Sequence, residues 1–154
     1  MSGATEILPG LWLGDLICAQ EGHFLQDKQI HMLLNCSPSE IESRDPMIQV
    51  YQRIPFTPKV EWKVSPQVCQ LLDSYCTMLH AQLNQYNILV CCQTGNQNSA
   101  LIVLMYLMKY GRYKAKTAFQ LLKTKRTEIE SIFTRYAALL QYYQSLIETQ
   151  NVSN

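Results

Sequence analysis

The segment from residue 88 to residue 110 constrains the fold more than any other part of this chain. It opens with the apolar run of residues 88–91, which is typical of a buried strand. A polar stretch follows at residues 93–99, and residues 100–110 are apolar enough to predict a helix that is buried on most sides. A buried strand joined by one loop to a buried helix indicates an α/β fold, because the helix must pack on the sheet that holds the strand.

Further strands and helices are predicted on both sides of this segment. Short apolar runs bounded by turn residues predict strands at residues 11–13, 30–35, 50–54 and 87–91. Apolar residues at helical spacing, in places only weakly, predict helices at residues 16–28, 66–86, 100–110, 114–126 and 129–147. Pro66 after the capping residue Ser65 favours a helix start, and Gly111 is expected to end a helix. We therefore expect a small central sheet flanked by helices.

Length and composition place the chain among folded proteins of ordinary size. Its 154 residues are 47% hydrophobic and 16% charged, which excludes a disordered chain. No internal repeat or linker is visible, so we expect one domain over residues 1–154, with a folded core from about residue 5 to residue 148. A net charge of +1, from 13 cations and 12 anions, excludes a protein that holds nucleic acid by bulk charge.

Several other classes of protein are not expected. The longest apolar run, residues 100–108, is about half as long as a membrane span requires. Residues 1–10 hold no basic segment followed by an apolar stretch, so we predict no secretory signal and expect a cytoplasmic protein, with access to the nucleus left open. The six cysteines form no C-x-x-C pair, and the three histidines do not cluster with them, so we expect neither a metal nor a cofactor.

The polar loop after the strand has the properties of an anion site. Gly95 lies in its middle, and a glycine there allows a positive φ that turns successive backbone N–H groups towards one point. The loop leads into a helix N-terminus, whose free N–H groups and dipole favour an anion. The same field favours the thiolate form of Cys92. An ordinary polar connection between strand and helix is the alternative.

In this setting the loop resembles the signature of the cysteine-based dual-specificity phosphatases, His-Cys-x5-Arg-Ser/Thr. Segments that resemble that family's strands and helices, in the family's order and spacing, lie at residues 7–15, 30–36, 51–55, 100–108 and 118–126. The resemblance implies the family's fold and a phosphocysteine mechanism in which Cys92 is the nucleophile and the Ser99 hydroxyl assists the departing thiolate. It also implies a phosphate-binding loop that consists of Gln93, Thr94, Gly95, Asn96, Gln97, Asn98 and Ser99.

The chain departs from this signature at chemically important positions. Cys91 replaces the histidine, and Asn98 replaces the arginine, which gives phosphate a two-pronged donor with a permanent positive charge. The family's general-acid aspartate would fall at or near Pro58, and no aspartate occurs between Asp45 and Asp73. Loss of the arginine is expected to lower the rate by roughly 10²–10³ or more. Loss of the acid is expected to lower it by a further factor of about 10²–10⁴.

These losses lead to two hypotheses from different classes. The first is a catalytically impaired pseudophosphatase that binds phosphoproteins or serves as a signalling scaffold. The second is a residual phosphatase for tyrosine, serine or threonine phosphates, in which Cys92 still forms a phosphocysteine. Four residues could replace the missing groups: Arg53, Lys59, Glu61 and Lys63. We expect the first hypothesis to hold, and with it no catalysis of physiological use.

Two further features leave alternatives open. The adjacent Cys91 and Cys92 could be a redox pair, or a structural thiol beside a degenerate nucleophile. From residue 109 to residue 127 the chain has seven cations and no anion, which could attract an acidic or phosphorylated partner or could form a solvated helix face. These cations are Lys109, Arg112, Lys114, Lys116, Lys123, Lys125 and Arg126.

Overall fold

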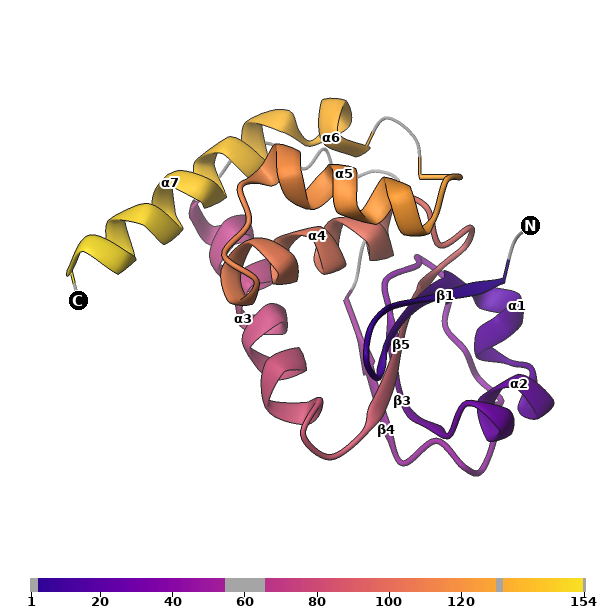
Figure 1. Cartoon of the computed structure of the whole chain (residues 1–154). Helices are drawn as coiled ribbons and strands as arrows, with labels where there is room; N and C mark the ends of the chain where they lie inside the picture. The colour runs from indigo at the N-terminus through magenta and orange to yellow at the C-terminus, as the bar shows by residue number, and fades with distance from the viewer. Residues whose placement is uncertain (1–2, 55–65, 130–131, 154) are drawn as a thin grey trace.

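A computed structural model of the chain describes residues 3–54, 66–129 and 132–153 (Figure 1). Its strands are β1 (Ala4–Leu8), β2 (Leu11–Asp15), β3 (Ile30–Asn35), β4 (Val50–Arg53) and β5 (Asn87–Cys92). They form one sheet in the order β1-β2-β5-β3-β4. β1 pairs antiparallel with β2, whereas the other three pairings are parallel. The predicted α/β fold with a small central sheet is confirmed.

Helices cover both faces of this sheet. As Figure 1 shows, α1 and α2 lie on one side of it and the later helices lie on the other. No helix within the described ranges is both long and apolar enough to span a membrane. The helices are α1 (Leu16–Ala19), α2 (Gly22–Asp27), α3 (Pro66–Gln82), α4 (Asn98–Tyr110), α5 (Ala115–Lys125), α6 (Ile132–Arg135) and α7 (Ala137–Ser153).

The central strand β5 supplies side chains to two separate cores. Successive residues of a strand point to opposite faces. Ile88 and Val90 therefore belong to the larger cluster, which contains the buried residues of α3, α4, α5 and α7. Leu89 and Cys91 belong to the smaller cluster, which lies against α1 and α2. Burial on both faces explains why β5 is apolar throughout.

The parallel register brings several strand ends together. Asp15 at the end of β2 lies opposite Cys92 at the end of β5. Asn35 at the end of β3 lies opposite both Cys91 and Arg53. Ligands of open α/β sheets bind outside the carboxyl ends of the strands, so this edge is the expected location of a site.

Element boundaries differ from the sequence predictions in several places. β1 was not predicted as a strand. The single helix expected at residues 16–28 is two short helices, and the one expected at residues 129–147 is α6 and α7. At Gly22, where α2 begins, a Cβ would lie 2.6 Å from Asp45 Oδ2, so a tertiary contact shapes that junction. The helix expected from residue 100 begins at Asn98, which places two more polar loop residues in its first turn.

The helix α4 ends at Gly111, as the sequence predicted, but the glycine is not its left-handed residue. Gly111 caps the helix with φ −83, and the left-handed residue is Arg112, with φ 61. The Tyr113 N–H donates to the Leu107 carbonyl oxygen at 3.4 Å, which closes a turn of the kind that ends many helices. Glycine is required at 111 because a Cβ there would lie 2.6 Å from the Leu107 carbonyl oxygen.

Candidate functional site

The loop between β5 and α4 lines a pocket of about 150 Å³ at the carboxyl edge of the sheet. We call it the loop pocket. Its walls are made by Ser37 and Pro38 after β3 and by Cys92, Gln93, Thr94, Gln97 and Asn98. It adjoins the N-terminus of α4, where unpaired backbone N–H groups favour an anion. Tertiary structure thus gathers five of the eight residues that the sequence indicated in one concave place.

The sulfur of Cys92 has a hydroxyl partner inside the loop. Cys92 Sγ lies 2.9 Å from Ser99 Oγ, and either atom could donate the hydrogen bond. Both residues are almost completely buried. A thiol beside a hydroxyl at the end of a strand is the arrangement that the resemblance implied for nucleophile and supporting serine.

Gly95 gives the loop its shape, as the sequence predicted. Its φ is +77, in the left-handed region that side chains other than glycine rarely adopt. A Cβ at this position would lie 2.7 Å from Arg126 Nη2 and 2.7 Å from the Gly14 carbonyl carbon. Glycine is therefore needed both for the backbone conformation and for the close approach to β2.

Arg126 holds the loop in place by hydrogen bonds, a role that the sequence did not predict. Its Nε donates to Asn96 Oδ1 at 2.9 Å, and its Nη2 donates to the Thr94 carbonyl oxygen at 3.0 Å. Its Nη1 donates to Thr5 Oγ1 at 3.0 Å, which ties the loop to β1. Only 2% of Arg126 is exposed. The sequence counted this residue among the surface cations, since nothing local marks a contact between segments so far apart.

Asp15 places a carboxylate near this buried guanidinium. Its Oδ1 accepts from the Cys18 N–H at 2.8 Å, which caps α1, and its Oδ2 accepts from the Gly3 N–H at 2.9 Å. Burial by itself raises the pKa of Asp15. These two hydrogen bonds and the charge of Arg126 outweigh that effect, so the pKa lies below its ordinary value of 3.8.

Asn98, at the position of the family's arginine, is held by structural contacts. Its Nδ2 donates to the Cys36 carbonyl oxygen at 3.2 Å. Its Oδ1 accepts from the Tyr136 hydroxyl at 3.2 Å. The amide thus bridges the segment after β3 and the junction of α6 with α7. Among the described residues that line the loop pocket, none carries a positive charge.

Arg135 is an exposed cation that contacts a residue of the pocket wall. Its Nη1 donates to Gln97 Oε1 at 3.2 Å, and the residue is exposed. A surface guanidinium held by one amide oxygen is not preorganised for a phosphate in the way that a signature arginine would be. The sequence did not single out Arg135, because an arginine in a predicted amphipathic helix carries no signal of this contact.

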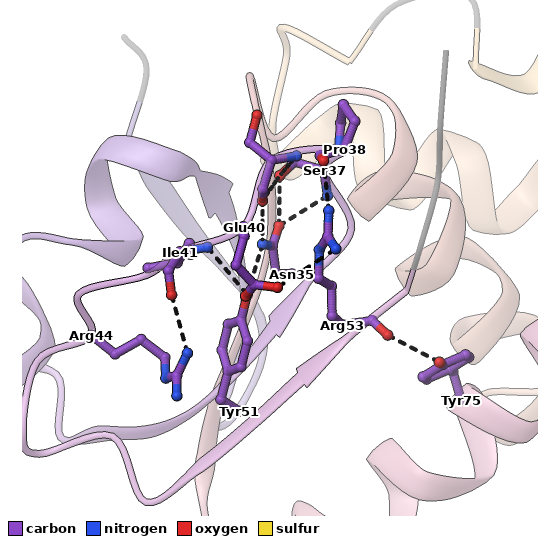
Figure 2. A network of polar contacts seen from close by, with 10 residues as sticks. Asn35, Ser37, Pro38, Glu40, Ile41, Arg44, Tyr51, Arg53 and Tyr75 are labelled. Carbon is purple, nitrogen blue, oxygen red and sulfur yellow. Dashed lines mark hydrogen bonds and ion pairs between the residues drawn. The ribbon is translucent and has the colours of Figure 1, made fainter. Parts of the chain in front are cut away.

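Arg53, one of the suggested substitutes, is not among the described residues that line the loop pocket, and its polar contacts are drawn in Figure 2. Its Nη2 donates to the Pro38 carbonyl oxygen at 2.5 Å, and its Nη1 lies 3.6 Å from Glu40 Oε2. Tyr51 donates to Glu40 and accepts from Asn35 Nδ2 at 3.0 Å, so β3, β4 and the wall share one polar network. The other suggested substitutes and the general-acid position, Lys59, Glu61, Lys63 and Pro58, lie outside the described residues.

The adjacent cysteines of β5 point to opposite faces of the sheet. Cys92 belongs to the larger core and lines the loop pocket, whereas Cys91 belongs to the smaller core. Burial, with a smaller contribution from neighbouring Cys92, raises the pKa of the Cys91 thiol well above its ordinary value. All six cysteines are free thiols. This geometry favours a structural thiol at 91 over a redox pair.

Comparison with known proteins identifies the family. The model of the family described as dual specificity phosphatase, catalytic domain, matches residues 11–145. The chain belongs to this family. Human dual specificity protein phosphatase 1 is 30% identical over 148 residues, which cover 94% of this chain and 38% of that protein. The chain spans only 37% to 38% of the length of the curated dual specificity phosphatases that it first matches.

Solved structures share the dual specificity phosphatase fold with this chain. A mouse dual specificity phosphatase complexed with zinc tungstate has a TM-score of 0.83 at 22% identity, over 99% of this chain and 92% of that one. The human tyrosine phosphatase-like serine/threonine/tyrosine-interacting protein has a TM-score of 0.76 at 22% identity, over 95% of this chain and 98% of that one. The described part of this phosphatase-family chain holds no group of three or more side chains placed to bind a metal ion.

Proposed function

We propose that this chain is a catalytically impaired pseudophosphatase of the dual specificity phosphatase family that acts as a phosphoprotein-binding or scaffolding module in signalling. The observation that carries the proposal is the chemistry of position 98. Asn98 is neutral, and its amide is bonded to the Cys36 carbonyl oxygen and the Tyr136 hydroxyl. A phosphoryl group in the loop pocket would meet backbone N–H groups and the dipole of α4, without a guanidinium to stabilise the transferring charge.

Two other observations support a binding role. Gly95 and Arg126 keep the loop in a shaped conformation, so the chain retains the cradle although it lacks the arginine. The human tyrosine phosphatase-like protein of the same fold is named as an interacting protein, which is the kind of role we propose here.

The six cysteines are free thiols, which favours a reducing compartment. We propose the cytoplasm, with access to the nucleus left open.

The second candidate is a residual phosphatase, and the 2.9 Å contact between Cys92 Sγ and Ser99 Oγ favours it. The thiolate would attack phosphorus as the bond from phosphorus to the aryl oxygen breaks. The aryl oxide would leave with the electron pair and would need no general acid. Water would then attack the phosphocysteine, the phosphorus–sulfur bond would break, and phosphate and the thiolate would be released.

Hydrolysis assays separate the two candidates. We expect the purified chain to release no more phosphate from phosphotyrosine or phosphothreonine peptides than its Cys92→Ser variant does. Brisk hydrolysis by the unmodified chain would overturn the pseudophosphatase proposal. Turnover of an activated aryl phosphate that disappears in Cys92→Ser would support the residual phosphatase.

A restoration experiment tests whether the named positions cause the impairment. Asn98→Arg combined with Pro58→Asp should yield measurable hydrolysis of phosphopeptides in a folded variant. A folded double variant without activity would show that the cause lies elsewhere in the loop. Titration of the unmodified chain with a phosphotyrosine peptide, followed by NMR, tests the binding role. Shifts at residues 92–99 would support phosphoprotein binding, and their absence would contradict it.

A further inference from the structure

The seven cations of residues 109–126 do not form one surface. Three of them have partners inside the molecule. Lys109 Nζ lies 2.9 Å from Asp73 Oδ1, Lys123 Nζ donates to the Ile129 carbonyl oxygen, and Arg126 is buried under the loop. The other four are exposed, and their side chains make no hydrogen bond or ion pair with another described residue: Arg112, Lys114, Lys116 and Lys125.

Three of the four exposed cations surround a groove beside α7. One pocket of about 370 Å³ lies between the start of α5 and the N-terminal half of α7, and Lys114 and Lys116 line it. A second pocket of about 150 Å³ is lined by Arg112 and Lys114. The two pockets share Lys114 and Gln144 in their walls. We call them together the α5–α7 groove.

The floor of the α5–α7 groove is apolar. Ala115 and Leu140 line the larger pocket, and Met108 and Ile147 line the smaller one. Among the described residues that line the larger pocket, none is a carboxylate. The described lining of the smaller pocket includes one carboxylate, Glu148, whose Oε1 lies 3.5 Å from Gln144 Nε2. An apolar floor with cations on its rim matches a chain segment that carries acidic side chains around an apolar one.

We propose that the α5–α7 groove binds an acidic segment of a partner protein, with aspartate or glutamate side chains on Arg112, Lys114 and Lys116 and an apolar side chain on the floor. This inference rests on the proposed binding role but uses a surface separate from the loop pocket. If the chain hydrolyses phosphopeptides, the proposed function is wrong, but the measurements of binding at the groove are not affected.

The arrangement of the cations fits several carboxylates better than one phosphate dianion. Lys114 and Lys116 are single charges on flexible stems, and each can meet a separate carboxylate along an extended segment. The first N–H of α5, that of Ala115, already donates to Gln144 Oε1 at 3.0 Å. A phosphate would need several free backbone N–H groups close together, and the N–H group of Ala115 is already bonded to Gln144.

The test uses the whole chain and three short fluorescein-labelled peptides with one central leucine. They carry glutamates, glutamines or phosphoserines around that leucine. We expect the glutamate peptide to bind in fluorescence anisotropy at low salt and to weaken as salt is raised. The glutamine peptide should not bind measurably. NMR shifts on binding should fall at residues 112–116 and 137–148.

Charge-reversed variants test the named cations. Lys114→Glu with Lys116→Glu should weaken the glutamate peptide by about tenfold or more, since two favourable pairs become repulsive. Acidic residues at a helix N-terminus stabilise the helix, so this variant should remain folded. Lys125→Glu is the control for charge reversal itself: it reverses one lysine, half of the double variant's charge change, on an exposed residue of α5 that is not among the described lining residues of either pocket, and it should leave the affinity nearly unchanged.

Two further variants should change affinity in opposite directions. Arg112→Gly removes a guanidinium and also relieves the positive φ of 61, so we expect affinity to fall by about two- to fivefold while the melting temperature stays or rises. Glu148→Gln removes the carboxylate of the groove and should strengthen binding by about twofold.

Four outcomes would overturn the proposal. They are equal binding of the glutamate and glutamine peptides, no effect of the double charge reversal, shifts confined to residues 92–99, and phosphoserine binding more than about tenfold tighter than glutamate binding, a gap of about 1.4 kcal/mol. The last outcome would assign a phosphate site to the groove instead.

Discussion

Arg126 shows how a single side chain can hold a functional loop in shape. Its three nitrogens bond to Asn96, the Thr94 carbonyl oxygen and Thr5, and it lies against Gly95 where a Cβ would not fit. A buried guanidinium whose three nitrogens are each bonded to the protein contributes structure, and Arg126 is not among the described residues that line the loop pocket. Its loss should therefore appear first in stability.

Replacing Arg126 with methionine should lower the free energy of unfolding by about 2–4 kcal/mol, because the partly buried acceptors on Asn96 and Thr94 lose a charged donor. Urea denaturation measures this difference. Lys125→Met is the matched control, since Lys125 is exposed and a surface change of this kind costs less than about 0.5 kcal/mol. Equal stability of the two variants would contradict the supporting role of Arg126.

The carboxylate of Asp15 should make stability depend on pH. Its pKa in the folded chain is below the ordinary value of 3.8, so the unfolded chain takes up the proton first as pH falls. The stabilisation is fully present above pH of about 4 and is lost as pH falls through the folded pKa. The advantage of the unmodified chain over Asp15→Asn should shrink over this acidic range in denaturation curves. A constant difference down to pH of about 2 would contradict this linkage.

Among the secondary-structure elements, β5 gives its two neighbouring cysteines different surroundings, because its side chains alternate between the two faces of the sheet. Cys91 faces the smaller core and Cys92 faces the loop pocket, because successive strand residues point to opposite sides. A disulfide between them would require the end of β5 to leave the sheet, where Cys91 and Cys92 pair with Gly14 and Asp15.

Alkylation of the native chain tests this assignment. Iodoacetamide should modify Cys92 at least about tenfold faster than Cys91, whose raised pKa and burial suppress the thiolate. Mild oxidant should cause no loss of two hydrogens in the peptide that carries both residues. Mass spectrometry measures both results, and a vicinal disulfide in the folded chain would contradict the structural assignment of Cys91.

At the scale of the whole molecule, one carboxylate joins three helices. Asp73 on α3 accepts from Lys109 on α4 at 2.9 Å and from the Tyr143 hydroxyl on α7 at 2.6 Å. Tyr143 is completely buried, and burial followed by the charges of Cys76 and Asp73 raises its pKa. This contact fixes α7, which forms one wall of the α5–α7 groove, against the core.

Replacing Asp73 with alanine should lower the free energy of unfolding by about 2–3 kcal/mol, because the buried Tyr143 hydroxyl loses its acceptor and Lys109 its partner. Tyr143→Phe should cost about 1 kcal/mol, since Asp73 keeps Lys109. A double-mutant cycle by urea denaturation should give a coupling above about 0.5 kcal/mol. Additive effects would contradict the contact.

Several features of the fold could be predicted from residue type and spacing over short stretches of the sequence. The strand, loop and helix around Gly95, the start of α3 at Pro66 and the α/β class follow from spacing and from residue type over a few positions. The seven-residue separation of Cys92 and Ser99 is likewise local, and their side chains lie 2.9 Å apart at Sγ and Oγ.

The roles of the long polar side chains depend on contacts between distant segments of the chain, which residue type and spacing do not predict. Arg126 meets Thr5 across 121 residues, and Asn98 meets Cys36 across 62. The tertiary structure also separates the seven cations: three have partners inside the molecule, three line the α5–α7 groove, and Lys125 is exposed outside it. The physical reason is that a charged or amide side chain can be satisfied by water or by many partners, so its sequence context does not choose among them, whereas apolar periodicity admits only a few ways to be buried.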